Sequence, residues 1–506
     1  MRLDEILREM PDARYAGPLD RDVAAVVYDS RQVAPGALFV AVPGAHTDGH
    51  KYVESALSAG AVAAVVQTDR RDLVGHLPAD RLIWVPRAQR ALAEAAVAFY
   101  RHPGREIGVI GVTGTDGKTT TTALISDLLQ RLGHPSGRLG TVDFKIADRV
   151  WPNDSRQSTL EAVEVQALLR RMADAGVRYA VVESTSHGLA LDRVYGCEYD
   201  IGVFTNLTSD HLDFHGTVEQ YFRDKARLFE MVGASVDKGI PKRAVLNADS
   251  PWFDELRRYC TYPILSYSRR APADLMAIAP EVTASGIRMR VRWRGAVYLV
   301  ALRLTGEFNV ENALAALGAA LALGLDPEPA TTALGTLAGP PGRLQRIDAG
   351  QPFGVIVDYA HTPDSLAKVL GILRPLTEGR LTVVFGCAGE RDKTKRPVMG
   401  EIAGKLADFV VLTDEDPRLE DRHAIIDEIA AGLEAAGRRL GTDYLKVPDR
   451  QEAIDVAIRR AGQGDLVLLA GKGHEGSIIY ADGKRPWDEC AAARAALAGR
   501  GFRQPA

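Results

Sequence analysis

Short apolar runs alternate with turns along the whole chain, and this pattern predicts an α/β protein. In the first hundred residues such runs occupy 23–28, 37–41 and 61–66, which indicates a small α/β domain. Continuous apolar runs at 179–182 and 201–204 suit buried strands of a mostly parallel sheet covered on both faces. In the last third, four more apolar runs are separated mostly by Ala-, Leu- and Ile-rich helical patterns, which predicts a doubly wound, Rossmann-like fold.

Two segments rich in proline and glycine predict the domain boundaries. Residues 101–105 have the composition of a linker, and a new apolar strand begins at Ile107. Residues 339–342, Gly-Pro-Pro-Gly, would interrupt any helix. Because a domain usually takes roughly 100 to 200 residues, we expect three domains. Their predicted bounds are 1–99, 100–335 and 336–506.

Composition narrows the possible partners and location. The 506 residues contain no apolar run near the ~20 residues of a membrane-spanning helix, and the first residues do not form an export signal. We therefore expect a cytoplasmic protein without membrane insertion. The four cysteines lie far apart, which argues against a zinc site or a disulfide framework. The formal net charge of -4 gives no global preference for nucleic acid, so any anionic ligand needs local Lys and Arg residues.

A glycine-rich loop between a predicted strand and a predicted helix has the pattern of a phosphate-binding loop. The strand covers 107–110, and the helix carries apolar residues at helical spacing over 124–132. Backbone N–H groups of such a loop and the helix N-terminus bind phosphate, Lys118 can reach the transferable phosphate, and the Thr119 hydroxyl can ligate magnesium. The loop therefore predicts a central domain that resembles a P-loop ATPase. At this point an ATP-dependent ligase and a kinase are equally possible. The candidate ATP-binding residues of this loop are Gly114, Thr115, Asp116, Gly117, Lys118, Thr119 and Thr120.

Acidic and histidine residues follow the next two predicted strands. Glu183 comes directly after the run 180–182, and a carboxylate at the end of a strand beside a phosphate loop is well placed to hold magnesium. The following strand leads into 205–216, which contains two histidines and two aspartates. This cluster favours a metal-binding role for His211.

Taken together, these motifs resemble the Mur ligase family of three-domain ATP-dependent ligases. The resemblance rests on their order and spacing and covers nearly the whole chain. It is closest to the members that add the third residue of the cell-wall peptide, through 29–31, 187–189, 213–216 and 386–392. The family motifs lie at 114–120, 183–189, 205–213, 221–225, 309–313, 342–343, 358–363 and 471–475.

The resemblance implies an amide ligase that adds a diamino acid to UDP-N-acetylmuramoyl-L-alanyl-D-glutamate through an acyl phosphate, in peptidoglycan biosynthesis. It implies ATP and Mg²⁺ as cofactors, and we expect a monomer without nucleic-acid partners. In the family, the lysine matching Lys225 is carbamylated by carbon dioxide and helps to hold a second magnesium with the residue matching His211. Without the resemblance, Lys225 between Asp224 and Ala226 would be a solvated helix lysine. The implied catalytic and metal-binding set is Lys118, Thr119, Glu183, His211 and Lys225.

Further site residues are implied only by the family match. Asn312 would lie at the adenine, with Arg343 and Asp358 near the phosphates and ribose. Two positions depart from the family pattern, because Thr185 replaces the usual serine and Gln157 stands where asparagine is common. The implied UDP-substrate residues are Ser30, Ser158, Thr159, Thr185 and Arg193, and the implied amino-acid residues are Arg391, Glu415, Asp416, Pro417, Arg418, Gly471 and Glu475.

The segment 415–418 bears on which amino acid is added. Family members that use meso-diaminopimelate usually show D-N-P-R, with the arginine clamping the distal carboxylate. Arg418 is present here, but Asp416 replaces the asparagine. The added anion would favour a distal ammonium, as in lysine or ornithine, by about 1 kcal/mol, while meso-diaminopimelate stays possible.

Two other functions would share some of these sequence features. A folylpolyglutamate-synthetase-like ligase shares the central fold, but the first domain with its Asp29-Ser30-Arg31 motif argues against it. A nucleotide-binding regulator without catalysis could lose Lys118, Glu183, His211 or Lys225 without penalty, yet all four are present.

Overall fold

A computed structural model of the protein describes residues 1–44, 47–155, 157–208 and 210–503. The described chain forms two compact units. Within these ranges, no helix combines the length and the apolar character needed to cross a bilayer. Unit 1 comprises Met1–Leu275 with Leu314–Ala330, and unit 2 comprises Met276–Ala313 with Thr331–Ala506.

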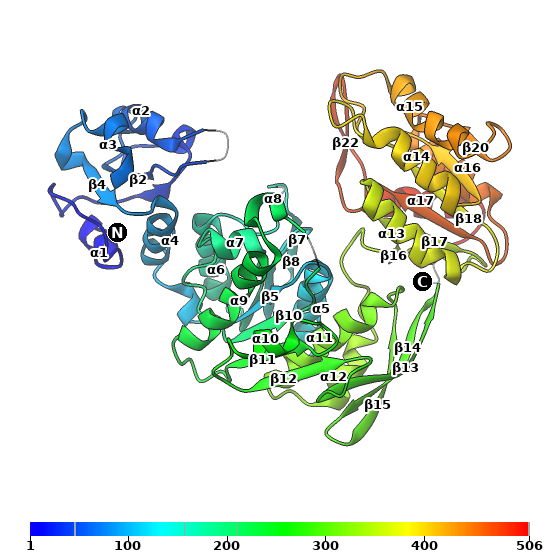
Figure 1. Ribbon diagram of the computed structural model, residues 1–506, viewed down its shortest axis with the longest axis horizontal. Helices are drawn as coiled ribbons and strands as arrows, with labels where there is room; N and C mark the ends of the chain where they lie inside the picture. Colours follow the sequence, from blue (N-terminus) through cyan, green and yellow to red (C-terminus); the bar gives the residue numbers. More distant parts are fainter. Residues whose placement is uncertain (45–46, 156, 209, 504–506) are drawn as a thin grey trace. The chain divides into compact units, whose positions relative to one another are not determined.

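The N-terminal part of unit 1 is built on a four-stranded parallel sheet, as the three early apolar runs indicate (Figure 1). Helices α1 and α4 share one apolar core with the sheet, and α2 and α3 share another, so both faces are covered. The strands follow in spatial order: β1 (Ala25–Val27), β2 (Ala37–Val40), β3 (Ala63–Gln67) and β4 (Leu82–Val85). The helices are α1 (Leu3–Arg8), α2 (Val53–Ser58), α3 (Arg71–Val74) and α4 (Ala88–Phe99).

The rest of unit 1 is a larger sheet with β5 at its centre. β10 and β9 pair with β5 on either side and in parallel, so the loops after these three strands open at the same edge of the sheet. Only β7 and β8 run antiparallel to their neighbours in this part. In spatial order the strands are β12 (Ile264–Ser268), β11 (Arg243–Asn247), β10 (Ile201–Phe204), β5 (Gly108–Thr113), β9 (Tyr179–Glu183), β6 (Ser136–Leu139), β7 (Asp143–Ile146) and β8 (Arg149–Pro152). The helices are α5 (Lys118–Arg131), α6 (Ala162–Asp174), α7 (Ser186–Ala190), α8 (Leu212–His215), α9 (Val218–Ala234) and α10 (Phe253–Arg257).

Unit 2 contains two antiparallel strand pairs, at 286–302 and 477–486, and a doubly wound domain. The doubly wound sheet is parallel except for β16, with α13, α14 and α15 in one apolar core and α16 and α17 in the other. This confirms the predicted Rossmann-like fold. Its strands in spatial order are β16 (Gln345–Arg346), β17 (Gly354–Asp358), β21 (Leu466–Ala470), β18 (Leu381–Phe385), β19 (Phe409–Leu412) and β20 (Tyr444–Lys446). Its helices are α13 (Pro363–Leu373), α14 (Lys395–Leu406), α15 (Arg422–Ala435), α16 (Arg450–Arg460) and α17 (Glu489–Gly499).

A few elements complete the chain. The remaining strands are β13 (Leu275–Thr283), β14 (Gly286–Trp293), β15 (Ala296–Leu302), β22 (Ser477–Tyr480) and β23 (Gly483–Pro486). β14 pairs with β15 and β22 with β23, both antiparallel. Helices α11 (Phe308–Ala322) and α12 (Pro327–Leu334) each contribute residues to both units.

Candidate active site

The phosphate loop has the geometry that its glycines predict. Gly114, with φ 150°, leaves no room for a side chain, because a Cβ there would lie 1.9 Å from the Thr205 hydroxyl. Gly117 takes the left-handed φ of 81° and caps α5, so the first N–H groups of that helix are free to face an anion. Lys118 begins α5, and its Nζ donates to the Thr115 carbonyl at 2.7 Å. Thr120 is buried in the first turn.

The loop after β10 supports the phosphate loop through the backbone. Thr115 N donates to the Asn206 carbonyl and Asp116 N to the Asn206 side-chain oxygen, both at 2.9 Å. The Thr205 hydroxyl donates to the Asp116 carbonyl at 2.6 Å. Asn206 therefore fixes the turn that precedes Lys118, a role that the sequence reasoning did not assign to it.

Glu183 is buried against the start of α5. Its Oε1 accepts the Thr119 hydroxyl at 3.0 Å, while its Oε2 accepts both the backbone N–H and the hydroxyl of Thr141 at 3.0 Å. Thr119 and Glu183, two of the four predicted magnesium ligands, are therefore neighbours, and both offer the oxygen donors that Mg²⁺ prefers. Thr141 was missed because it belongs to no motif, although it follows β6, the strand beside β9.

Lys225 is almost fully buried, at 2% exposed, which contradicts its interpretation as a solvated helix lysine. Its Nζ donates to the Gly114 carbonyl at 2.7 Å and lies 4.3 Å from the centre of the Tyr221 ring. Burial, together with the charge of Lys118, holds the pKa of Lys225 well below its usual range. This lowered pKa favours the uncharged form of the amine beside the phosphate loop.

His211 occupies an exposed position before α8 with a left-handed φ of 52°. Its ring lies 5.0 Å from that of His187 and 6.2 Å from that of Tyr221, centre to centre. Over the ranges that the structure describes, no three His, Cys, Asp or Glu side chains are arranged to hold a metal ion. His211 therefore does not join Glu183 in a ready-made ligand set.

Three of the five predicted UDP-substrate residues converge beside Glu183. The Thr159 hydroxyl donates to the Glu183 carbonyl and accepts from both the N–H and the hydroxyl of Thr185. Arg193 Nη1 donates to the Thr159 carbonyl at 3.2 Å. Ser158 is half-buried next to this group. Ser30 lies apart in the chain, in a turn of the N-terminal sheet stabilised by the Asp29–Arg31 ion pair.

The residues expected at the nucleotide base and ribose belong to unit 2. The Asp358 carboxylate accepts the backbone N–H groups of Leu344 and Ala360 at 2.8 and 2.9 Å, while burial raises its pKa. The Arg343 guanidinium lies over the Tyr359 ring at 5.2 Å. Asn312 is buried on α11 and donates to the Asn309 side chain at 2.8 Å, so it is not a surface amide.

A buried ion-pair cluster gathers several predicted amino-acid residues in unit 2. Asp416 Oδ1 accepts from Lys472 Nζ at 2.9 Å and from Ile479 N at 3.0 Å. The same ammonium donates to Glu475 Oε2 at 2.6 Å, and Glu475 Oε1 accepts from the Tyr359 hydroxyl at 3.3 Å. Lys472 is fully buried. The charge of Asp416 is therefore compensated, a pairing that sequence reasoning did not foresee.

Glu415 lies buried beside this cluster, and burial raises its pKa to about 7. Its Oε2 accepts no hydrogen bond from any residue that the structure describes. Gly471, with φ 102°, faces Glu415, because a Cβ there would come within 3.8 Å of the Glu415 side chain. Arg418 is half-buried after Pro417, with a left-handed φ of 55°, whereas Arg391 is exposed.

Comparison with known proteins identifies the family. The Mur ligase family catalytic domain matches residues 22–100, the Mur ligase middle domain matches 112–320, and the Mur ligase glutamate ligase domain matches 342–473. The UDP-N-acetylmuramyl-tripeptide synthetase of Roseiflexus sp. (strain RS-1) is 54% identical over 99% of this chain and 100% of its own length. The UDP-N-acetylmuramoyl-L-alanyl-D-glutamate--2,6-diaminopimelate ligase of Geobacillus thermodenitrificans (strain NG80-2) is 41% identical over 98% of this chain and 99% of its own.

A solved structure agrees with these matches along the whole chain. The structure of a UDP-N-acetylmuramoyl-L-alanyl-D-glutamate--2,6-diaminopimelate ligase aligns with a TM-score of 0.71 and 31% identity, covering 99% of both chains. The expected fold, a small N-terminal α/β domain, a central parallel-sheet domain with a phosphate loop and a Rossmann-like C-terminal domain, is thereby confirmed. The chain belongs to the Mur ligase family and is an ATP-dependent ligase.

Proposed function

We propose that the protein joins a diamino acid to UDP-N-acetylmuramoyl-L-alanyl-D-glutamate in peptidoglycan biosynthesis. The observation that carries this proposal is the full-length 54% identity to a tripeptide synthetase. It is supported by the phosphate loop, where Lys118 begins α5 and the Thr119 hydroxyl donates to the Glu183 carboxylate. The name of the Geobacillus relative specifies the same UDP-linked dipeptide as its substrate. We further propose that the enzyme acts in the cytoplasm as a monomer, where ATP and UDP-linked precursors are available.

The reaction needs activation because a carboxylate is a poor electrophile. The terminal phosphoryl group of ATP moves to the substrate carboxylate, which gives an acyl phosphate and ADP. The α-amine of the incoming amino acid then attacks the carbonyl carbon, loses a proton and expels inorganic phosphate. Lys118 and the N-terminus of α5 stabilise the negative charge on the transferred phosphoryl group.

Thr119 and Glu183 would hold Mg²⁺, which supplies charge neutralisation between the nucleotide and the substrate carboxylate. Burial favours the uncharged amine of Lys225, and only this form can attack carbon dioxide. An N–C bond then forms, the nitrogen loses a proton, and Lys225 becomes a carbamate anion. With His211, that anion would provide ligands for a second Mg²⁺. The nearby charge of Lys118 supports an anion at this position.

We propose lysine or ornithine as the preferred amino acid, with meso-diaminopimelate as the alternative. The sequence argument assigned the selecting charge to Asp416, but Lys472 compensates that carboxylate. The support now comes from two carboxylates, Asp416 and Glu475, that share the one Lys472 ammonium. A distal ammonium is attracted to such an excess of negative charge, whereas a distal carboxylate is repelled. Arg418 favours the carboxylate and is the reason to test both.

The test is phosphate release from ATP with the UDP-linked dipeptide and each of lysine, ornithine and meso-diaminopimelate, with the product identified by mass. We expect the greatest stimulation by lysine or ornithine, and greater stimulation by meso-diaminopimelate would overturn the preference. The Lys118→Ala variant should lose peptide-bond formation; undiminished synthesis would refute the mechanism. Removal of carbon dioxide and bicarbonate should lower the rate if Lys225 acts as a carbamate.

A further inference from the structure

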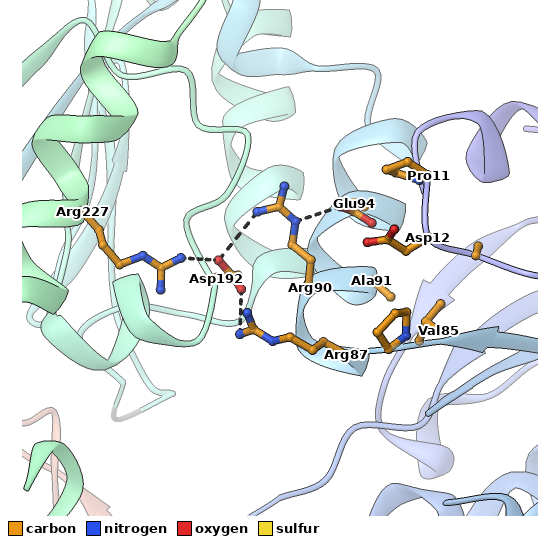
Figure 2. Close-up of a pocket in the computed structure, with 11 residues that line it drawn as sticks. Pro11, Asp12, Val85, Arg87, Arg90, Ala91, Glu94, Asp192 and Arg227 are labelled. Atoms are coloured by element: carbon orange, nitrogen blue, oxygen red, sulfur yellow. Dashed lines mark hydrogen bonds and ion pairs between the residues drawn. The ribbon is translucent and has the colours of Figure 1, made fainter. Parts of the chain in front are cut away.

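Asp192, a residue outside those assigned above, is a buried carboxylate surrounded by partly exposed arginines (Figure 2). It follows α7, is only 4% exposed and has a left-handed φ of 56°. Arg227 Nη2 donates to its Oδ1 at 2.6 Å, and Arg87 Nη2 donates to its Oδ2 at 3.1 Å. Arg90 Nη1 lies 3.8 Å from its Oδ1. One carboxylate therefore pairs with three guanidinium groups, two from the N-terminus of α4 and one from α9, and forms an arginine junction with them.

These contacts connect the N-terminal sheet with the helix that carries Lys225. Arg87 is the N-cap residue of α4, directly after β4, whereas Arg227 lies on α9 two residues beyond Lys225. Arg227 also donates to the Ala190 carbonyl at the end of α7. The loop after α7 therefore contacts both α9 and the N-terminus of α4 through Asp192.

The next residue in the chain, Arg193, belongs to the proposed substrate site. Its backbone N–H donates to the Gly188 carbonyl, and its guanidinium contacts the Thr159 carbonyl and the Glu161 carboxylate. Asp192 and Arg193 therefore have separate partners, with Asp192 bound to the arginine junction and Arg193 to Thr159 and Glu161. Because the two residues are adjacent, a shift of Asp192 moves the backbone of Arg193.

Charge explains why the junction depends on a carboxylate. Arg87 and Arg90 lie at the N-terminus of α4, where the helix dipole disfavours positive charge. Arg90 has a second partner in Glu94 and lies over the Tyr195 ring, but Arg87 has no other ion pair among the residues that the structure describes. Without the Asp192 charge, the guanidinium groups would repel one another and the loop would lose its fixed position.

We propose that Asp192 is a positioning residue for substrate binding. It holds Arg193 and the N-terminal sheet in the positions that binding of the sugar-peptide substrate requires. This inference rests on the proposed function, because Arg193 is assigned to that substrate. It predicts an effect on the affinity for the UDP-linked dipeptide rather than on ATP or on the chemical step.

A solvent-open cavity of about 330 Å³ beside the junction allows a chemical-rescue experiment. It is lined by Asp12, Arg87, Arg90, Asp192 and Arg227 among others, as Figure 2 shows. Asparagine and glycine both tolerate a left-handed φ, so Asp192→Asn and Asp192→Gly remove the charge without backbone strain. The glycine variant also leaves a space that a small carboxylate such as formate can enter.

The experiment compares steady-state constants of the wild type, Asp192→Asn and Asp192→Gly. We expect the KM for the UDP-linked dipeptide to rise about tenfold, equivalent to about 1.4 kcal/mol, while kcat and the KM for ATP stay within about twofold. Formate should lower the raised KM of Asp192→Gly but not that of the wild type. The matched control is Asp174→Asn, which removes the exposed ion pair with Arg170 and should change none of these constants.

Several results would overturn the inference. They are a dipeptide KM of Asp192→Asn within twofold of the wild type, a parallel loss of kcat and both affinities with a lower melting temperature, or no response of Asp192→Gly to formate. Turnover by the wild type distinguishes a failure of this inference from a failure of the proposed function. A wild type without turnover of the UDP-linked dipeptide refutes the proposed function itself, whereas an active wild type with an unaffected Asp192→Asn variant refutes only the role of Asp192.

Discussion

Replacing Asp416 with asparagine should change which amino acid the enzyme prefers. The substitution keeps the size of the side chain and an oxygen that can accept the Ile479 N–H. Lys472 loses one anionic partner but retains Glu475, so the buried ammonium is still paired. We therefore expect the protein to fold, while one of the two carboxylate charges that pair with Lys472 is lost.

The size of the effect follows from Coulomb's law. Two unit charges 4 Å apart interact by about 1 kcal/mol in water and by about 4 kcal/mol near a protein surface. Because Lys472 compensates Asp416 directly, we take the lower value for a distal group of the amino acid. A change of about 1 kcal/mol is about fivefold in the ratio of two specificity constants. The ratio of kcat/KM for lysine to that for meso-diaminopimelate should therefore fall about fivefold.

The assay is phosphate release with both amino acids in the wild type and in Asp416→Asn, at pH 8, which lies above the pKa of about 7 of Glu415. A melting curve checks that the variant is folded. A ratio within twofold of the wild type would show that the cluster does not sense the distal group. A ratio that moves toward lysine would reverse the sign of the electrostatic argument.

Three other substitutions test separate parts of the structure. Glu183→Gln should lower kcat at least about 100-fold without unfolding, because it removes the anionic ligand proposed for Mg²⁺; phosphate release within tenfold of the wild type would contradict that role. Glu489→Gln should destabilise unit 2 by about 3–5 kcal/mol in urea unfolding, because it leaves the fully buried Arg450 without its carboxylate; a loss below about 1 kcal/mol would argue against this estimate. Glu415→Gln should stabilise the protein at high pH. Since the pKa of Glu415 rises from 4.5 to about 7 on folding, wild-type stability falls as pH increases through this window. The variant's advantage should reach about 3 kcal/mol above pH 7 and vanish below about pH 4.5, and an equal advantage at pH 5 and pH 8 in melting experiments would exclude this explanation.

The phosphate loop could be predicted from sequence because its determinants are local. Gly114 and Gly117 are required by the backbone itself, and Lys118 begins the helix that the loop caps. The position of Glu183 could also be predicted from the local sequence. It ends a strand that pairs in parallel with β5, so it must lie at the same edge of the sheet as the phosphate loop. The alternation of strands and helices likewise predicts parallel α/β sheets, but it does not give the order of the strands within each sheet.

Lys225 was misread without the family resemblance, although its helix contained a usable signal. On α9 the buried residues Tyr221, Phe222, Leu228 and Phe229 recur at helical spacing, and Lys225 falls within that apolar stripe rather than on the opposite face. A lysine at such a position must either be neutral or find a partner. Its partner, the Gly114 carbonyl, is 111 residues away and could not be deduced from periodicity.

Substrate selection is the part that sequence could not resolve, because it depends on pairs of charges brought together by folding. The aspartate at 416 implies an uncompensated anion only as long as Lys472, 56 residues later, is unknown. Asp192 is likewise an ordinary loop acid until Arg87 and Arg227 are seen to bind it from two different helices. Phosphoryl transfer needs one backbone geometry that a short motif can encode, whereas the preference for a substrate is a small difference between opposing charges. Changes in amino-acid preference should therefore be sought at the partners of Asp416 as well as at Asp416 itself.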